Sequence, residues 1–170
     1  MMTFDTWLEQ TGPQIAHLID DRREPICDAV TNRLTTAFPS LCFDSSRPDA
    51  VEFQQHTFKE TPRRFHRLIQ VVLRFQTTLV IEREYRWGWA IMPRYGVARH
   101  HMISHARWYF DTVRLTGLLG RDDLVQLDQL AARVLQIIDQ ITAAAPPTLQ
   151  RPEPPVISNG HRANGRMPRA

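Results

Sequence analysis

The chain has 170 residues, of which 42% are hydrophobic, and its formal net charge is +3. This length fits one domain with a tail, and the apolar fraction suffices for a core. No run approaches the roughly 18 apolar residues of a membrane helix, the first residues lack the pattern of a signal peptide, and two cysteines suit a reducing compartment. We therefore expect a cytoplasmic protein that does not bind membranes.

The net positive charge comes from the C-terminal end of the chain. Four arginines follow residue 145, so the preceding part of the chain is close to neutral. A nucleic-acid-binding domain would carry a basic face on its folded body, and we expect no such partner. The residues after Ala145 are rich in proline and lack an apolar face. The sequence therefore predicts a helical domain over residues 1–145 and a disordered tail over 146–170.

The first half of the chain predicts short helices and corners. Apolar spacing within Phe4–Leu8 favours a helix that Thr11–Pro13 ends. A second apolar face covers residues 14–38, and Pro25 should kink or break that helix. Serines and prolines over residues 40–48 then indicate a corner.

The second half predicts longer helices. Thr61-Pro62 has the residue types of an N-cap and a first helical position, so a helix should begin there. Residues 79–99 are helical by pattern, with breaks expected near 92–96. A further helix should run from about 100 to 119, and a last helix, capped by Asp122, to about 144. No segment alternates with period two, so we expect an all-α fold of six to eight helices.

Three histidines, His100, His101 and His105, lie close together in the sequence. Neutral imidazoles bind iron, zinc and copper. His101 and His105 are four residues apart, which places them on one helix face where they could share a metal. No third ligand is evident nearby, and the alternative to a ligand site is a solvated helix face. A zinc protein or helical enzyme that uses these histidines is one hypothesis, which metal analysis would test.

Four large aromatic side chains flank these histidines in the sequence. Trp87 and Trp89 precede them, and Trp108 and Tyr109 follow. Aromatic residues at helical spacing usually form a core, but this density also suits a flat apolar ligand that lies against an imidazole.

Two segments resemble sensor globins, the haem domains of globin-coupled sensors. Ile26–Leu34 resembles the second long helix of that family. Arg94–His100, followed by Ile103-Ser104 and then Arg107–Tyr109, resembles the family's proximal segment, in which a histidine precedes an Ile-Gly and a Lys/Arg-Trp-Tyr. The resemblance covers residues 11–141 and implies a globin-like fold.

The resemblance also implies a cofactor and its ligands. Haem b would bind a diatomic gas (O2, CO or NO) with His100 as the proximal iron ligand and Thr31 facing the gas. Such a sensor is not an enzyme and would signal through a separate partner protein. Six further residues are expected to contact the haem: Phe38, Phe43, Leu68, Val97, Trp108 and Tyr109.

The sequence can also be aligned with the globins in a second way. Tyr95-Gly96-Val97 resembles the Tyr-Gly-Val that follows the proximal histidine in other bacterial globins, and it would place Met92 at the histidine position. Ordinary haem ligation would then be lost. The chain would instead bind a bilin, another apolar ligand or none, and act through partner proteins.

The last predicted helix favours a homodimer. Its seam repeats with alternating three- and four-residue steps at Leu127, Leu130, Val134, Ile137 and Ile141. Leu124, Leu135 and Ile138 widen the apolar arc beyond that seam. A second copy of the chain could cover the excess, and two-fold dimers are the commonest oligomers.

Overall fold

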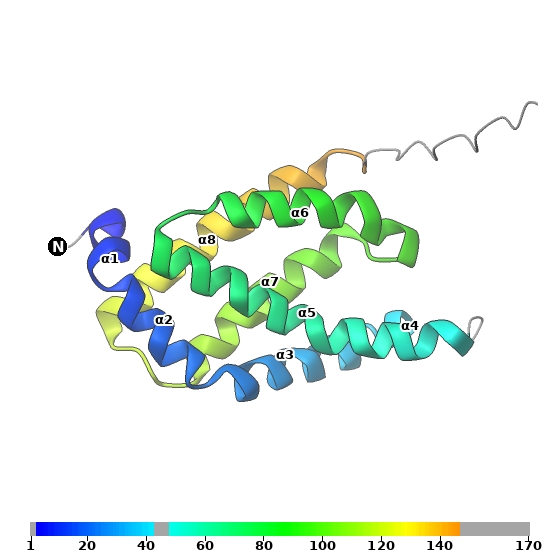
Figure 1. The fold of residues 1–170 in the computed structure, drawn as a ribbon, viewed down its shortest axis with the longest axis horizontal. Coiled ribbons are helices and arrows are strands. Elements are labelled where there is room, and N and C mark those ends of the chain that lie inside the picture. The colour runs from blue at the N-terminus through cyan, green and yellow to red at the C-terminus, as the bar shows by residue number, and fades with distance from the viewer. Residues whose placement is uncertain (1–2, 43–47, 147–170) are drawn as a thin grey trace, which may run out of the picture.

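A computed structural model describes residues 3–42 and 48–146, with side chains described for 3–41 and 56–146. All regular structure in these ranges is helical (Figure 1), which confirms the predicted all-α class. The elements in order are α1 (Phe4–Gln10), α2 (Gly12–Asp20), α3 (Arg23–Ala37), α4 (Pro39–Cys42), α5 (Pro48–Phe75), α6 (Leu79–Ile91), the 3-10 helix η1 (Met92–Tyr95), α7 (Arg99–Leu115) and α8 (Arg121–Ala143).

The long helices pack around one apolar core. Helix α7 packs against α8 and α3, α5 packs against α2 and α3, and α6 lies along α8. Figure 1 shows α7 crossing behind α5, with α3 beneath that crossing. Each helix contributes one apolar stripe to this core, as expected for amphipathic helices. The largest fully buried side chains include Ile26, Ile69, Ile81, Tyr109, Leu127 and Ile138.

The break predicted near Pro25 is confirmed, whereas the helix start predicted at Pro62 is wrong. Helix α2 ends at Asp20 and α3 begins at Arg23, so Pro25 lies in the first turn of α3, where the missing N–H has no intrahelical partner to lose. The helix predicted to begin at Thr61-Pro62 begins instead at Pro48, and α5 continues through Pro62. The Thr61 hydroxyl does not cap a helix. It donates to the Thr57 carbonyl at 2.6 Å.

Burial explains why α5 tolerates an internal proline. An interior proline removes one backbone hydrogen bond and usually costs about 3 kcal/mol. The following part of α5 buries four large apolar side chains, each worth roughly 1.5–3 kcal/mol: Phe65, Ile69, Val72 and Leu73. Packing therefore outweighs the local penalty.

The corner between α6 and α7 agrees with the predicted breaks. Helix α6 ends at Ile91, and Gly96 has a left-handed backbone with φ of 80°, a conformation that favours glycine. Helix α7 ends at Leu115, earlier than predicted, because the chain turns at Gly117 with φ of 68°. The N-cap of α8 is Gly120, whereas the predicted cap, Asp122, lies in its first turn.

Two further predictions concern the C-terminal tail and membrane-spanning helices. The tail from residue 147 onward lies outside the described residues. In the described ranges, no helix combines the length and the apolar character that crossing a bilayer requires.

Candidate functional site

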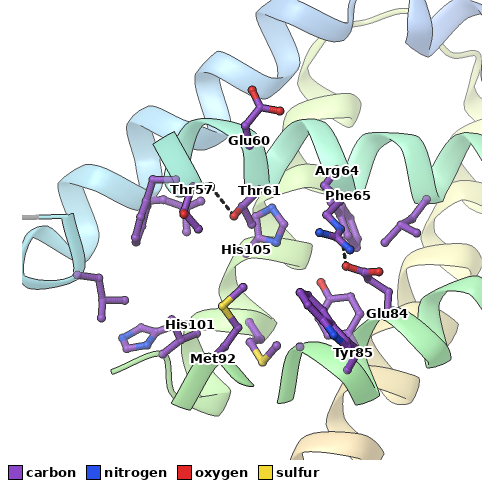
Figure 2. A pocket seen from close by; sticks show the side chains of 18 of the residues that line it. Thr57, Glu60, Thr61, Arg64, Phe65, Glu84, Tyr85, Met92, His101 and His105 are labelled. Atoms are coloured by element: carbon purple, nitrogen blue, oxygen red, sulfur yellow. Dashed lines mark hydrogen bonds and ion pairs between the residues drawn. The ribbon is translucent and has the colours of Figure 1, made fainter. Parts of the chain in front are cut away.

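A cavity of about 470 Å³ lies between α3, α5, α6, η1 and α7. Small-molecule sites typically measure about 300–1,000 Å³, so the cavity is large enough for such a ligand. Figure 2 shows side chains from these elements converging on one hollow. Most of its wall is apolar, and the apolar lining includes Leu34, Phe38, Phe65, Leu68, Tyr85 and Val97.

His105 brings an unpartnered imidazole nitrogen to this wall. Its side chain is buried, and Nε2 has no hydrogen-bond partner. Burial lowers the pKa of His105 to about 4, so the ring is neutral at pH 7. A buried polar atom without a partner costs roughly 1–3 kcal/mol. A ligand that bonds to this nitrogen would remove that cost, and a neutral imidazole is the form that binds metals.

His101 lines the same cavity, but one of its nitrogens is already in use. Nδ1 accepts a hydrogen bond from the backbone N–H of Ala98 at 2.8 Å, at the start of α7. In the neutral ring the proton is then on Nε2. Burial, with a smaller contribution from the neighbouring His100, lowers the pKa of His101. His101 therefore acts first as a helix cap, whereas the Nε2 of His105 is buried without a hydrogen-bond partner.

Two thioethers also line the cavity. Met92 is the first residue of η1, and Met102 is on α7 one turn before His105. The Met102 methyl group lies 3.4 Å from the point where a Cβ on Gly88 would stand. Met102 is thus packed against α6, which the small size of Gly88 permits.

Charged side chains surround the cavity's opening. Arg64 pairs with Glu84 at 2.5 Å, which joins α5 to α6 (Figure 2). The Arg64 guanidinium also lies 5.0 Å from the ring centroid of Trp87, which is 48% exposed. Arg67, one turn further along α5, lines the cavity and is exposed. The site thus has an apolar interior and charged residues of both signs, since Glu60 and Glu84 line it together with Arg64 and Arg67.

Three of the predicted contact residues meet at the cavity: Phe38, Leu68 and Val97. The predicted iron ligand, His100, does not join them. It is exposed in the first turn of α7, with its ring 3.8 Å from the ring of His101. Phe43 lies outside the described residues.

Thr31, Trp108 and Tyr109 are absent from the described lining of the cavity. The Thr31 hydroxyl donates to the Cys27 carbonyl within α3 at 2.9 Å. The Trp108 ring lies under the Arg33 guanidinium at 5.0 Å. Trp108 also stacks on Phe38, a lining residue, with 5.6 Å between the ring centroids.

Tyr109 belongs to a separate polar chain in the core. Its hydroxyl lies 2.9 Å from Nδ1 of His66, whose Nε2 lies 3.1 Å from Asp20. Both Tyr109 and His66 are fully buried. Burial lowers the pKa of His66, although Asp20 acts in the opposite direction. The neutral His66 therefore accepts from Tyr109 and donates to Asp20.

The sequence contained a signal for His105 that differs from metal-ligand spacing. Met102, His105, Ala106 and Tyr109 recur at three- and four-residue steps, so His105 lies within the apolar stripe of α7. A histidine in such a stripe is buried, and its nitrogens need partners. Tyr85 and Phe65 follow similarly from the stripes of their own helices.

Comparisons with known proteins identify no relative of this chain from which a function could be inferred. No family model, curated protein or solved structure matches the chain. Within the described residues, no three or more histidine, cysteine, aspartate or glutamate side chains form a group that could hold a metal ion. His100, His101 and His105 therefore do not make a zinc site of three protein ligands.

Proposed function

We propose that this chain is a globin-like protein that binds haem in the α3–α5–α6–α7 cavity and, through the haem, a diatomic gas. The observation that carries the proposal is the neutral, buried imidazole of His105, which lines an apolar cavity and whose Nε2 has no hydrogen-bond partner. The helix order and the resemblance of Ile26–Leu34 to sensor globins support a globin-like fold, although the resemblance of the second segment would place the iron ligand at His100. His105, rather than His100, is the axial ligand in this proposal.

The residues present fit the chemistry of a haem group. His105 would hold the iron through Nε2, and Phe38, Phe65 and Leu68 would exclude water from the ring faces. The exposed guanidinium of Arg67 would pair with a carboxylate at the edge of the ring. When bound, haem supplies an iron atom that coordinates O2, CO or NO.

Titration of the purified full chain with haemin tests the proposal. The wild-type protein should develop a sharp Soret band at one equivalent of haemin. His105→Leu should lose this band or bind haemin much more weakly, because it removes the nitrogen ligand. His100→Ala is the matched control, since His100 is exposed and outside the cavity lining, and it should bind as the wild type does. Loss of the band in His100→Ala alone would contradict the assignment.

A metal-free apolar ligand such as a bilin is a second candidate. The observation that favours it is the end of α6 at Ile91, which places Met92 immediately after the helix and His100 beyond the corner, in α7. In this alternative, Nε2 of His105 hydrogen-bonds a polar group of the ligand. Biliverdin binding with no haemin binding would select it.

A further inference from the structure

We infer that Arg64 gates the cavity: its guanidinium holds the α5 and α6 walls together, and a ligand enters or leaves when that contact opens. Arg64 lies on α5 and contacts two groups on α6, the Glu84 carboxylate and the Trp87 ring. These three side chains are called the gate below. The inference goes beyond the proposed haem binding, because it concerns how any apolar ligand reaches the cavity.

The first support is the position of the gate at the cavity. Arg64, Glu84 and Trp87 all line it, and Figure 2 shows the ion pair running from α5 to α6. Glu84 and Trp87 are three residues apart and so lie on one face of α6, where a single guanidinium can contact both. Where the side chains of α5 and α6 are described, no other ion pair joins the two helices.

An aromatic contact accompanies the ion pair. Phe65 and Tyr85 follow Arg64 and Glu84 in the sequence, and their rings meet edge to face with 6.3 Å between the centroids. Both rings are buried, whereas 51% of the Arg64 side chain is exposed. The two walls are thus joined by an exposed ionic contact and a buried aromatic one. A ligand that passes between α5 and α6 here must separate both.

The second support is that α6 is held more firmly to α8 than to α5. Helix α6 packs along α8, and its contacts with α5 are fewer. The indole N–H of Trp89 also donates to the carbonyl of Ala144, the C-cap of α8, at 2.9 Å. Helix α6 can therefore move away from α5 while it keeps its main packing on α8.

The third support is a second partner for Arg64. Glu60 lies four residues earlier on α5, lines the same cavity and makes no ion pair with another described residue. A glutamate four residues before a basic residue has the favourable orientation for an ion pair within a helix. When Arg64 leaves Glu84 it can pair with Glu60, so opening does not leave the guanidinium without a counter-ion.

The consequence of this arrangement is kinetic. The gate contacts are present whether the cavity is empty or occupied, so weakening them eases entry and exit alike and leaves the affinity nearly unchanged. An exposed ion pair is a weak contact, and its removal should raise both rates by about two- to fivefold.

Stopped-flow fluorescence of the full chain with N-phenyl-1-naphthylamine, a neutral apolar probe, tests the gate. Glu84→Gln should raise the association and dissociation rates about two- to fivefold. Glu82→Gln is the matched control, because Glu82 pairs with Arg86 within α6 and is not among the lining residues. It should keep the wild-type rates. Glu60→Gln should lower both rates, because it removes the partner of the open state.

A further variant places the probe. Leu68 lines the cavity, and Leu68→Trp should fill part of it and weaken probe binding strongly. Circular dichroism of each variant confirms that it folds. Wild-type rates in Glu84→Gln, faster rates in Glu82→Gln or unslowed rates in Glu60→Gln would overturn the inference. Unchanged probe binding in Leu68→Trp, or no binding by the wild type, would overturn it as well.

The gate and the haem proposal fail separately. If the probe rates follow the expected pattern but haemin does not bind, the haem proposal is wrong and the gate stands. If haemin binds but Glu84→Gln exchanges the probe at the wild-type rates, the gate is wrong and the haem proposal stands.

Discussion

At the scale of single residues, the buried imidazole of His105 should make the folding stability depend on pH. Burial lowers the pKa of His105 to about 4, whereas an unfolded histidine titrates near 6.5. The folded protein binds this proton more weakly than the unfolded chain does. The stability due to the neutral ring is thus complete above about pH 6.5 and is lost as the pH falls towards 4, by roughly 3 kcal/mol.

Urea unfolding of the haem-free protein at several pH values between about 7 and 4 measures this loss. His105→Leu should lose less free energy of unfolding on acidification, because leucine does not titrate. His66 and His101, whose pKa values are also lowered, remain in both proteins and keep some pH dependence. Equal acid sensitivity in His105→Leu and wild type would contradict the burial argument.

The polar chain Asp20–His66–Tyr109 makes a second residue-scale prediction. Tyr109→Phe removes a hydroxyl that lies 2.9 Å from Nδ1 of His66 and leaves that nitrogen buried without its partner. The expected loss is about 1–3 kcal/mol of unfolding free energy. Urea unfolding measures it at neutral pH. Haemin affinity should not change, because Tyr109 is not among the cavity's lining residues. A stability equal to the wild type's would show that the hydrogen bond has no net value.

At the scale of elements, the start of α2 packs tightly against the end of α5. A Cβ added to Gly12 would meet the backbone carbonyl oxygen of Leu73. Gly12→Ala should therefore force the two helices apart, with a loss of about 1–3 kcal/mol. Gly120→Ala is the matched control, since its Cβ would stand 3.9 Å from Asp123. Thermal unfolding distinguishes them: Gly12→Ala should melt well below the wild type, and similar melting of both variants would refute the close contact.

The helices that the sequence predicted well are those with a clear apolar period and a glycine or proline at the boundary. The α6–α7 corner is an example, because Met92-Pro93 and Gly96 act locally. The boundary at Pro62 was wrong because burial of the residues after it, which depends on the tertiary fold, outweighs the local signal. Local propensity cannot measure that burial.

The same distinction applies to the site. Phe38, Leu68 and Val97 were predicted as contact residues from the resemblance to sensor globins, and they do line the cavity. Whether His100 or His105 faces it depends on the rotation of α7, which is set by packing against α3 and α8. That packing turns His105 inward with Tyr109 and leaves His100 in solvent. The spacing of the histidines does not show this rotation, whereas the apolar stripe of Met102, Ala106 and Tyr109 around His105 does.

At the scale of the whole molecule, α8 determines how much apolar surface is left for a second copy. Leu127, Leu130 and Val134 are buried in the chain's own core. Ile138, which was predicted to face outward, is fully buried as well, because α6 and α7 both pack along α8. Leu135 and Ile141 are partly buried against the core, and Val125 is 45% exposed. The remaining apolar surface is thus narrower than the sequence suggested.

The homodimer through α8 stays a prediction, and the structure changes the variant that tests it. Leu135→Asp places a charge on the partly exposed side of α8 and should give a folded monomer. Ile138→Asp is unsuitable as an interface variant, since an unpaired carboxylate in the core should unfold the chain. Light scattering at tens of micromolar, roughly the range where weak specific dimers form, measures the assembly, and circular dichroism measures folding. A monomeric wild type would mean that helices of the same chain cover the whole apolar surface of α8, and the homodimer prediction would be wrong.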